Sequence, residues 1–401
     1  MAREMAIPFY PETRTFQTHA EGQARAEARA ALRVQHLVKY IGDELILDDV
    51  SFSVAEGESL VLLGPSGSGK STTLRLLAGL AAPDGGDIFL KNRHIEHLRA
   101  RERNIGVIFQ HYSLFPRMTV AENIAFGLKI RGVKKQQRFD KADEMLTMIG
   151  LTEHRDKYPA QLSGGQQQRV AIARALAYEP DLLLFDESFS ALDPQTRVGL
   201  RREIRTLLRR LRVPAIFITH DQEEGMELGD QIAILNRGRL EQIGTPYEVY
   251  NEPQTEFVAT FLGAANVVTG RQRDRVIEID EEHFLFSQGV ELLHADNVKI
   301  VFRPEDIVLG HLNGRLETPH QMGRAEVLDV AFAGAAESLT VRLLPKSQSG
   351  LTLASNLASG ARLTANIVLK VTRTKWDAHK LPLQPGDVVT LGLKSYKLLR
   401  A

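Results

Sequence analysis

Residues 58–71, ESLVLLGPSGSGKS, form a short apolar run that passes directly into a glycine-rich loop. The loop fits the pattern G-x-x-x-x-G-K-[ST], in which glycines let the backbone wrap around phosphate groups and point its N–H groups inward. The apolar run predicts a buried strand, and we expect a helix to begin near Gly69, with its N-terminus favouring an anion. The alternative is a flexible glycine and serine turn, which the Lys-Ser ending and the flanking strand and helix disfavour.

Within this loop, Lys70 is predicted to reach the β and γ phosphates of ATP, and Ser71 to bind Mg²⁺. The residues expected to bind ATP are Gly64, Pro65, Ser66, Gly67, Ser68, Gly69, Lys70, Ser71 and Thr72. Residues 181–188, DLLLFDES, place Asp186 and Glu187 at the carboxyl end of an apolar strand, where α/β folds bind their ligands. Asp186 can hold Mg²⁺, and Glu187 can polarise the attacking water. Two adjacent carboxylates alone often mark a solvated turn, but beside a phosphate loop they indicate an ATPase.

The composition limits the remaining possibilities. The chain has 401 residues, enough for two or three domains, and its 50 basic and 50 acidic residues give a formal charge of zero. No overall field attracts a polyanion, and we expect no nucleic acid partner. The chain lacks cysteine, which excludes disulfides, thiolate zinc sites and a cysteine nucleophile. No apolar run approaches the roughly 18 residues of a spanning helix, and the N-terminus lacks the apolar core of a secretory signal.

The order of the segments predicts an α/β fold. Residues 32–40 and 45–54 have the pattern of antiparallel strands, and short buried strands then alternate with helices, as in a parallel sheet covered by helices. From residue 263 onward the sequence is rich in strand-like segments. The predicted division is a loosely attached extension at 1–32, a P-loop NTPase domain at 33–262 with an antiparallel β subdomain and a helical subdomain at about 111–178, and a small all-β, OB-like barrel domain at 263–401.

Residues 194–212 illustrate the predicted helices. Asp193 is a good N-cap and Pro194 a good first residue, and the apolar residues that fall on one face are Ile204, Leu207, Leu208 and Leu211. Six arginines stand at positions 201, 202, 205, 209, 210 and 212. We expect them to form a solvated face opposite the apolar stripe rather than a nucleic acid site.

A second glycine turn stands at residues 162–170, LSGGQQQRV, far from the phosphate loop in the sequence. The first loop alone does not choose between a small-molecule kinase, a GTPase and a motor. LSGGQ, followed by QQRVAIARAL, DLLLFDES and SALD, resembles the signature of the ATP-binding cassette (ABC) family, and the resemblance covers about residues 33–262. Ser163 is a suitable N-cap, and the glycines after it make another helix start suited to an anion. The resemblance implies an ABC cassette fold and a homodimer. In that dimer, the γ-phosphate of ATP bound to one subunit contacts the signature residues of the other subunit, which are Leu162, Ser163, Gly164, Gly165 and Gln166.

The resemblance assigns further residues. Gln110, in VIFQHYSLF, matches the glutamine that senses Mg²⁺ and the attacking water, and His220, in ITHDQ, matches the histidine that contacts the γ-phosphate. The implied catalytic set is Glu187, His220 and Gln110, and the implied Mg²⁺ ligands are Ser71, Gln110 and Asp186. Asp193, in SALD, matches a loop at the dimer interface.

Two positions depart from the family pattern. Ser188 follows Glu187 where the family usually has proline, which we expect to change loop rigidity rather than chemistry. The family pattern places the adenine-stacking aromatic just before Gly42, at Ile41. We assign this role to Tyr40, one residue earlier, although neighbouring side chains of a strand face opposite ways.

The kind of cassette protein is indicated by the rest of the chain. Soluble cassette ATPases of translation or DNA repair typically carry two cassettes, long coiled coils or zinc-bearing insertions, whereas this chain has one cassette, no heptad run and no cysteine. Residues 303–307, RPEDI, resemble the regulatory β-barrel of importer ATPases, and residues 244–263 resemble the link into it. The resemblance implies an importer subunit at the cytoplasmic face of the inner membrane, with permease subunits and a substrate-binding protein as partners. Glu187 disfavours a regulator that binds ATP without hydrolysis.

The predicted cargo is an oxyanion such as sulfate or thiosulfate. His111 and Tyr112, directly after Gln110, are similar to the sulfate/thiosulfate subunits, whereas Pro116 and Arg117 are closer to sugar and polyamine importers. Because this segment lies where a cassette meets its permease, it should report partner identity rather than touch substrate. The alternative cargo is a sugar, a polyamine or iron. The alternative reading of His111 is an ordinary polar residue of a loop.

Overall fold

The computed structural model describes residues 30–189, 193–273, 276–279, 284–287, 297–312, 316, 318–344 and 367–400. The chain divides into two units, one that reaches Gln231 and includes Leu235–Leu240, and one that comprises Ile232–Ile234 and the chain from Glu241 onward. The predicted extension lies outside the described residues except for its last three residues, which already belong to a strand. The predicted boundary between residues 262 and 263 remains a prediction. Among the described helices, none combines the length and apolar character that crossing a bilayer requires.

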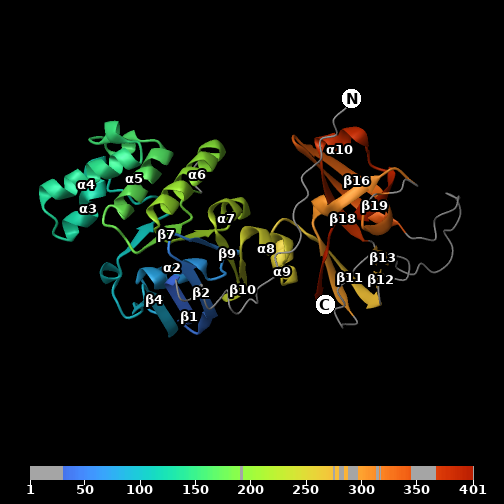
Figure 1. Ribbon diagram of the computed structural model, residues 1–401, viewed down its shortest axis with the longest axis horizontal. Helices are drawn as coiled ribbons and strands as arrows, with labels where there is room; N and C mark the ends of the chain where they lie inside the picture. Colours follow the sequence, from blue (N-terminus) through green and yellow to red (C-terminus); the bar gives the residue numbers. More distant parts are fainter. Residues whose placement is uncertain are drawn as a thin grey trace, which may run out of the picture. The chain divides into compact units, whose positions relative to one another are not determined.

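A six-stranded sheet contains the strand that precedes the phosphate loop (Figure 1). Its order is β10-β9-β3-β8-β7-β6, and its strands are β3 (Ser59–Leu63), β6 (Ile105–Ile108), β7 (Leu182–Asp186), β8 (Ala215–Thr219), β9 (Gln231–Asn236) and β10 (Arg239–Gly244). The pairs β3–β8, β8–β7 and β7–β6 are parallel. Both β3 and β8 are buried along their whole length, which explains their uninterrupted apolar sequences. The parallel sheet predicted from the sequence is thus confirmed.

A second sheet is antiparallel and has the order β2-β1-β4-β5, with strands β1 (Ala30–Ile41), β2 (Glu44–Ala55), β4 (Gly85–Leu90) and β5 (Arg93–His94). This confirms the antiparallel pair predicted from residues 32–40 and 45–54. Leu32, Leu37 and Leu47 are fully buried on its inner face. A Cβ atom built on Gly69 would lie 2.5 Å from Cδ2 of Leu47, so this sheet packs directly against the phosphate loop.

Three helices pack against one another in the helical subdomain, namely α3 (Val120–Ile130), α4 (Lys135–Met148) and α5 (Gly164–Leu176). In Figure 1 they form the green group, apart from the blue β1 and β2. Both α3 and α5 begin with a capping box, formed by Thr119 with Glu122 and by Ser163 with Gln166. All three helices fall within the range predicted for this subdomain, and local sequence determines the starts of α3 and α5.

Three further helices complete this part of the chain, namely α2 (Lys70–Ala78), α6 (Pro194–Leu211) and α7 (Gln222–Leu228). The predicted apolar stripe of α6 is confirmed, since Ile204 and Leu208 are buried. The predicted solvated arginine face is wrong for Arg201, whose side chain is 3% exposed and pairs with Glu227 at 2.8 Å. Arg205 and Arg209 also have a partner, Asp230, because α6 packs beside α7 and Asp230 lies two residues after the end of α7.

The second unit contains an antiparallel sheet of ten strands. These are β11 (Asn266–Arg273), β12 (Val276–Glu278), β13 (Phe284–Ser287), β14 (Val298–Phe302), β15 (Ile307–Gly310), β16 (His320–Ala333), β17 (Ala336–Leu344), β18 (Val368–Thr374), β19 (Val388–Leu393) and β20 (Lys397–Arg400). Alternating residues fill its core, for example Leu339, Val341 and Leu343 of β17. The all-β character predicted for the C-terminal part is confirmed.

Two short helices, α8 (Pro246–Asn251) and α9 (Glu256–Phe261), precede this sheet, and α10 (Lys375–Lys380) follows β18. Arg303, the first residue of RPEDI, is 5% exposed and donates to the backbone carbonyls of Tyr250, Ala259 and Leu262. Its guanidinium also lies 3.9 Å from the centre of the Tyr250 ring. The two segments that the sequence singled out, residues 244–263 and 303–307, are therefore joined by one buried cation.

Candidate functional site

The phosphate loop joins β3 to α2. Lys70, the first residue of α2, is 6% exposed, and its ammonium donates to the carbonyls of Gly64 and Pro65 at 2.8 and 2.7 Å. It also lies 3.3 Å from Oγ of Ser68. Burial lowers the pKa of Lys70, and the nearby carboxylate of Glu187 acts in the opposite direction. The lysine charge is thus directed into the curve of the loop, where a phosphate group would be recognised.

Close packing requires glycine at two positions of this loop. A Cβ atom at Gly64 would lie 2.2 Å from the carbonyl oxygen of Leu235, which no real side chain permits. Gly69 has φ of 101°, and its Cβ would collide with the Leu47 side chain. The turn after β9 also binds the loop, because the Gly238 N–H donates to the Ser68 carbonyl at 3.2 Å. These contacts distinguish the loop from a flexible glycine and serine turn.

Two predicted catalytic side chains meet at the carboxyl ends of neighbouring strands. Glu187 follows β7 and His220 follows β8, and Nδ1 of the histidine lies 3.1 Å from Oε1 of the glutamate. Glu187 has φ of 44°, a conformation that costs energy in a residue with a side chain, and its N–H donates to the Ile218 carbonyl at 3.0 Å. The strained backbone turns the carboxylate toward His220. Burial and the Glu187 charge raise the pKa of the adjacent Asp186, against the opposing charge of Arg75.

The residues predicted to bind Mg²⁺ come from three elements. Ser71 lies in the first turn of α2, Asp186 ends β7, and Gln110 follows β6, the parallel neighbour of β7. A hydroxyl, a carboxylate and an amide oxygen are hard donors of the kind that Mg²⁺ prefers, so this donor set fits the ion. Ser188, the departure from the family pattern, is buried, and its hydroxyl lies 3.5 Å from the Ile108 carbonyl at the end of β6.

The second glycine loop starts α5. The Gln166 N–H donates to Oγ of Ser163 at 3.4 Å, and the Ser163 N–H donates to the Gln166 side chain at 2.9 Å, as the N-cap prediction requires. Leu162 is buried and anchors the turn, whereas Ser163 and Gly164 are exposed. Figure 1 shows α5 in the helical subdomain and α2 beside the sheets. The two loops therefore begin helices in different parts of the chain.

The remaining predicted site residues lie at the surface. Asp193 caps α6, with Oδ1 accepting from the Thr196 N–H at 3.0 Å, as predicted. Ser190, Ala191 and Leu192 of the SALD motif lie outside the described residues. Tyr40 is 46% exposed near the tip of the β1–β2 hairpin, and its neighbour Ile41 is exposed as well.

Glu224 is a buried carboxyl group that the sequence analysis missed. It is 4% exposed on α7, and its Oε2 accepts from the Thr219 hydroxyl at 2.9 Å. Burial raises the pKa of Glu224 to about 7, with the Asp221 charge adding to this effect. Because Thr219 directly precedes His220, the carboxyl group supports the backbone that carries the histidine. The only sequence signal is an acid three residues after the N-cap Asp221.

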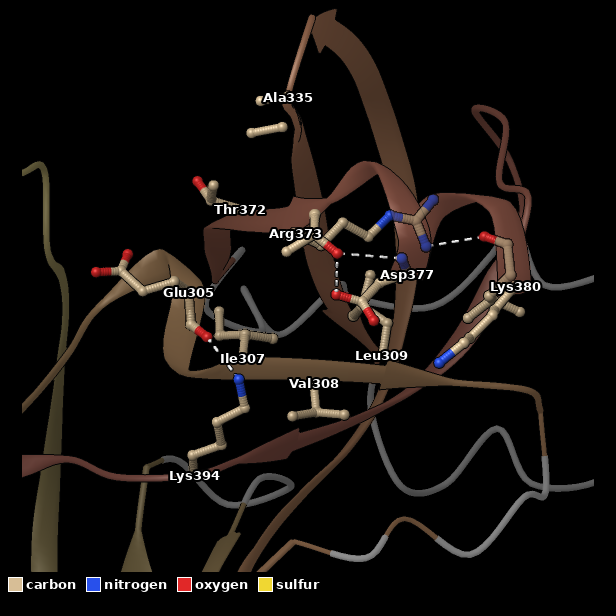
Figure 2. Close-up of a pocket in the computed structure, with 13 residues that line it drawn as sticks. Glu305, Ile307, Val308, Leu309, Ala335, Thr372, Arg373, Asp377, Lys380 and Lys394 are labelled. Carbon is tan, nitrogen blue, oxygen red and sulfur yellow. Dashed lines mark hydrogen bonds between the residues drawn. The ribbon is translucent and has the colours of Figure 1, made fainter. Parts of the chain in front are cut away.

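A separate cavity of about 400 Å³ lies in the second unit beside β15 and α10 (Figure 2). Arg373 and Lys394 both face it, but Arg373 pairs with Glu337 at 2.6 Å and Lys394 donates to the Glu305 carbonyl at 3.2 Å. These two cationic groups already have acceptors within the domain. The cavity is therefore a weaker candidate for anion binding than the phosphate loop.

Known proteins with similar sequences are ATP-binding proteins of transporters. The family model described as ABC transporter matches residues 47–190. The sulfate/thiosulfate import ATP-binding protein CysA of Halalkalibacterium halodurans is 39% identical over 320 residues, covering 77% of this chain and 90% of that protein. CysA 2 of Chromobacterium violaceum is 41% identical over 367 residues, covering 92% and 94%. The spermidine/putrescine import ATP-binding protein PotA of Bacillus cereus is 40% identical over 311 residues, covering 78% and 87%.

A solved structure also resembles the chain. It is cbiO1 from Clostridium perfringens, described as part of the ABC transporter complex cbiONQ, with a TM-score of 0.52 and 29% sequence identity. The match covers 55% of this chain and 90% of that one. Together with the sheets described above, it bears out the predicted fold class.

We predict that Glu224→Gln flattens the pH dependence of stability. The pKa of Glu224 is about 7 in the folded chain against 4.5 for an unperturbed glutamate, so the folded state binds more protons between these values. The free energy of unfolding should therefore fall by roughly 3 kcal/mol as pH rises through this window, and the amide should remove that fall. Urea unfolding between pH 5 and pH 8 measures it.

Glu223→Gln, which changes an exposed carboxylate on the same helix, is the matched control and should keep the wild-type slope. Identical slopes for the wild type and Glu224→Gln would show that the buried carboxyl group does not titrate in this range.

Proposed function

This chain belongs to the ABC transporter family of ATP-binding proteins, and from this membership we propose that it is the ATP-hydrolysing subunit of an importer. The relatives bear out the resemblance that LSGGQ and its flanking motifs indicated. The observation that carries the proposal is the 3.1 Å contact between His220 and Glu187. His220 follows β8, which pairs with the strand that leads to Lys70, and Glu187 follows β7, the next strand of the sheet. Such a pair beside a phosphate loop suits hydrolysis rather than nucleotide storage.

In the proposed bound state, the backbone N–H groups of residues 66–72 surround the ATP phosphates. The Lys70 ammonium exchanges its loop carbonyls for phosphate oxygens. Ser71, Gln110 and Asp186 would hold Mg²⁺, which neutralises phosphate charge when bound. Tyr40 would stack on the adenine, because its ring is exposed on a hairpin whose other strand reaches the loop through Leu47.

In the proposed hydrolysis step, the Glu187 carboxylate accepts a proton from the attacking water. His220, held by its backbone at the end of β8, keeps this carboxylate in position and presents its ring to the γ-phosphate. Gln110 approaches the same water from the end of β6. The roles divide among three parallel strands, so the reacting groups need no rearrangement of the sheet.

The signature loop is proposed to act on the ATP of a second subunit. Within one chain, α5 and α2 begin in different parts, so Ser163 and Lys70 belong to different loops. A head-to-tail homodimer would bring the exposed Ser163 and Gly164 of one subunit to the γ-phosphate on the other. Asp193, exposed at the start of α6, would lie at this interface.

We further propose that the dimer binds permease subunits at the cytoplasmic face of the inner membrane and responds to a loaded substrate-binding protein. The relatives import sulfate/thiosulfate or spermidine/putrescine, and sulfate is the proposed cargo here. Of the two residues that suggested it, His111 is exposed, whereas Tyr112 is 5% exposed and its carbonyl accepts from Arg174 at 2.9 Å. Only the histidine can therefore contact a permease. Polyamine import is the second candidate, favoured by the PotA relatives.

We predict that Glu187→Gln keeps ATP binding and lowers hydrolysis at least about 100-fold, because the amide is isosteric but accepts a proton poorly. Phosphate release and nucleotide binding should be measured on the same preparation. Glu179→Gln, at a side chain that is 80% exposed, is the matched control and should hydrolyse ATP normally. Near-normal turnover of Glu187→Gln would remove the role assigned to this carboxylate.

A mixture of two inactive variants tests the dimer. Lys70→Ala should lose nucleotide affinity, whereas Ser163→Arg should bind ATP as a monomer but fail to hydrolyse it. A mixed dimer places both lesions in one composite site and leaves the other site intact, so mixing should restore part of the ATPase activity. Loss of ATP binding by monomeric Ser163→Arg would instead place the signature serine and the nucleotide in one chain.

The cargo is tested with the chain assembled on its own permease. A sulfate-loaded binding protein should raise the rate of ATP hydrolysis, and a spermidine-loaded one should not. In a strain without other sulfate importers, deletion should abolish growth on sulfate as sole sulfur source. Undiminished growth would exclude sulfate and leave the ATPase assignment unaffected.

A further inference from the structure

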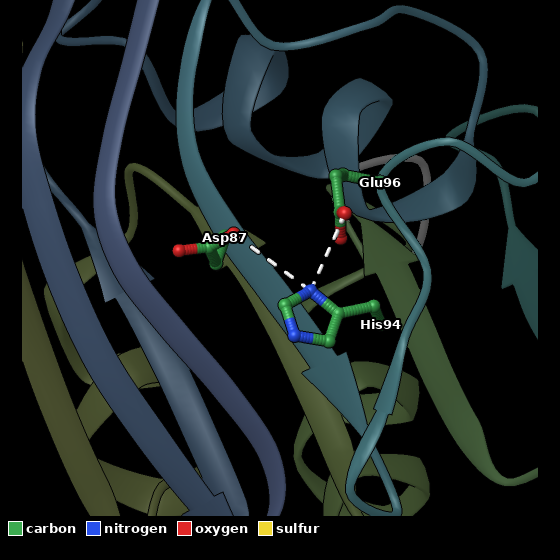
Figure 3. A group of neighbouring side chains, drawn as sticks. All are labelled: Asp87, His94 and Glu96. Carbon is green, nitrogen blue, oxygen red and sulfur yellow. Dashed lines mark ion pairs between the residues drawn. The ribbon is translucent and has the colours of Figure 1, made fainter.

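Three ligand-type side chains converge at the β4–β5 hairpin (Figure 3). They are Asp87, His94 and Glu96, and one ligand atom from each lies within 4.8 Å of the others. The proposed function uses none of them. Asp87 and His94 are about half exposed and Glu96 is 22% exposed, so the group is open to solvent from one side.

The hairpin register brings these side chains together. The turn residues Lys91 and Asn92 both have positive φ, 49° and 60°, as a two-residue type I′ turn requires. This turn pairs His94 with Phe89 across the strands. Because strand side chains alternate, Asp87 lies on the same face as Phe89, and Glu96 on the same face as His94.

The opposite face of the hairpin anchors it in the core. Ile88, Leu90 and Ile95 are buried, and the Ile95 N–H donates to the Ile88 carbonyl at 2.9 Å, which continues the pairing toward Glu96. A slip of one residue would expose these apolar side chains, so burial fixes the register. The three polar side chains are thus placed by the fold rather than by contacts among themselves.

Two neighbours restrict the ligand side chains further. The His94 ring packs on Phe89 with centroids 4.0 Å apart, and the Arg33 guanidinium lies 4.3 Å from the centre of the same phenyl ring. The backbone carbonyl of Glu96 accepts from the buried Arg103 at 2.9 Å. Because these side chains are already restricted, they lose less conformational entropy when they bind an ion.

The distances within the group suit a bridging ion better than direct hydrogen bonds. Nδ1 of His94 lies 3.4 Å from Oε1 of Glu96 and 3.7 Å from Oδ1 of Asp87. Charge-assisted hydrogen bonds are about 2.7 to 2.9 Å long. The exposed pair His36 and Asp49 on the same sheet reaches 2.6 Å, so such pairs do close in this protein.

Around a tetrahedral ion with bonds of about 2.0 to 2.1 Å, neighbouring ligand atoms stand about 3.3 to 3.4 Å apart. The two distances at His94 approach this spacing. His97 adds a second imidazole, with Nδ1 3.4 Å from the same Glu96 oxygen. Asp87 and Glu96 also supply carboxylate oxygens, which such an ion accepts as ligands.

We propose that Asp87, His94 and Glu96 form a surface site for a divalent transition metal ion of the Zn²⁺ class. An imidazole nitrogen with two carboxylate oxygens suits such an ion, whereas Mg²⁺ and Ca²⁺ take six or more oxygen ligands. Bound metal ties β4 to the residues after β5. Arg103 connects Glu96 to the end of α2, because the same guanidinium donates to the carbonyls of Leu76 and Leu77, so the site also supports the helix that follows the phosphate loop.

The test uses the full chain, stripped with a chelator and free of nucleotide. Zn²⁺ titrated by calorimetry should bind at one site per chain at micromolar concentrations, and Co²⁺ should give the visible spectrum of a tetrahedral site. His94→Gln and Glu96→Gln should each weaken this binding at least about tenfold. Circular dichroism and ATP binding should remain as in the wild type.

His36→Gln is the matched control, since it removes an exposed histidine that pairs with one carboxylate on the same sheet. It should bind metal like the wild type. The proposal is overturned if no saturable binding occurs at micromolar Zn²⁺, or if His94→Gln binds as tightly as the wild type. Neither result depends on ATP hydrolysis, so the outcome is independent of the proposed function.

Discussion

The parallel backbone pairing of β3, β8, β7 and β6 is the constraint on which the site depends. Parallel strands end at the same edge of a sheet, so the segment after each strand contributes to one surface. Here these segments carry Lys70, His220, Glu187 and Gln110, which come from positions far apart in the chain. Burial of β3 and β8 on both faces excludes water from their ladder and holds that edge rigid. The contact between His220 and Glu187 follows from this pairing, since each residue directly follows a paired strand and the Glu187 N–H donates to the Ile218 carbonyl.

The charged side chains around this edge of the sheet interact with other groups of the same chain. The Lys70 ammonium is held by loop carbonyls, and its lowered pKa reflects burial that Glu187 partly offsets. Asp186, directly before Glu187, and Glu224, which accepts from Thr219 directly before His220, are carboxyl groups with raised pKa values. Ionisable groups in enclosed positions beside a loop suited to phosphates are typical of sites that handle charge. The same arrangement makes stability depend on pH, because a buried carboxyl group is most stable when neutral.

Buried arginines connect separate segments within each of the two units. Arg103 links Glu96 to the end of α2, Arg201 pairs with Glu227 between α6 and α7, and Arg303 joins α8 and α9 to the RPEDI segment. A guanidinium carries five donors in a planar fork, so one side chain can satisfy several carbonyls that would otherwise be unpaired. Each of these arginines therefore connects segments that share no backbone pairing.

The sequence by itself determined the features that depend on neighbouring residues. The strand, loop and helix of residues 58–78, the N-caps Ser163 and Asp193 and the family membership all follow from short motifs, because turn, cap and strand preferences act within a few residues. The domain boundary and the roles of the site residues stay predictions. Tertiary structure alone decided which groups meet. It paired His220 with Glu187 and buried Arg201 against expectation. It also raised the pKa of Glu224 and brought the side chains of the β4–β5 hairpin group, Asp87, His94 and Glu96, close together. These outcomes depend on packing and register between distant segments, and local sequence preferences do not encode the burial that such packing produces.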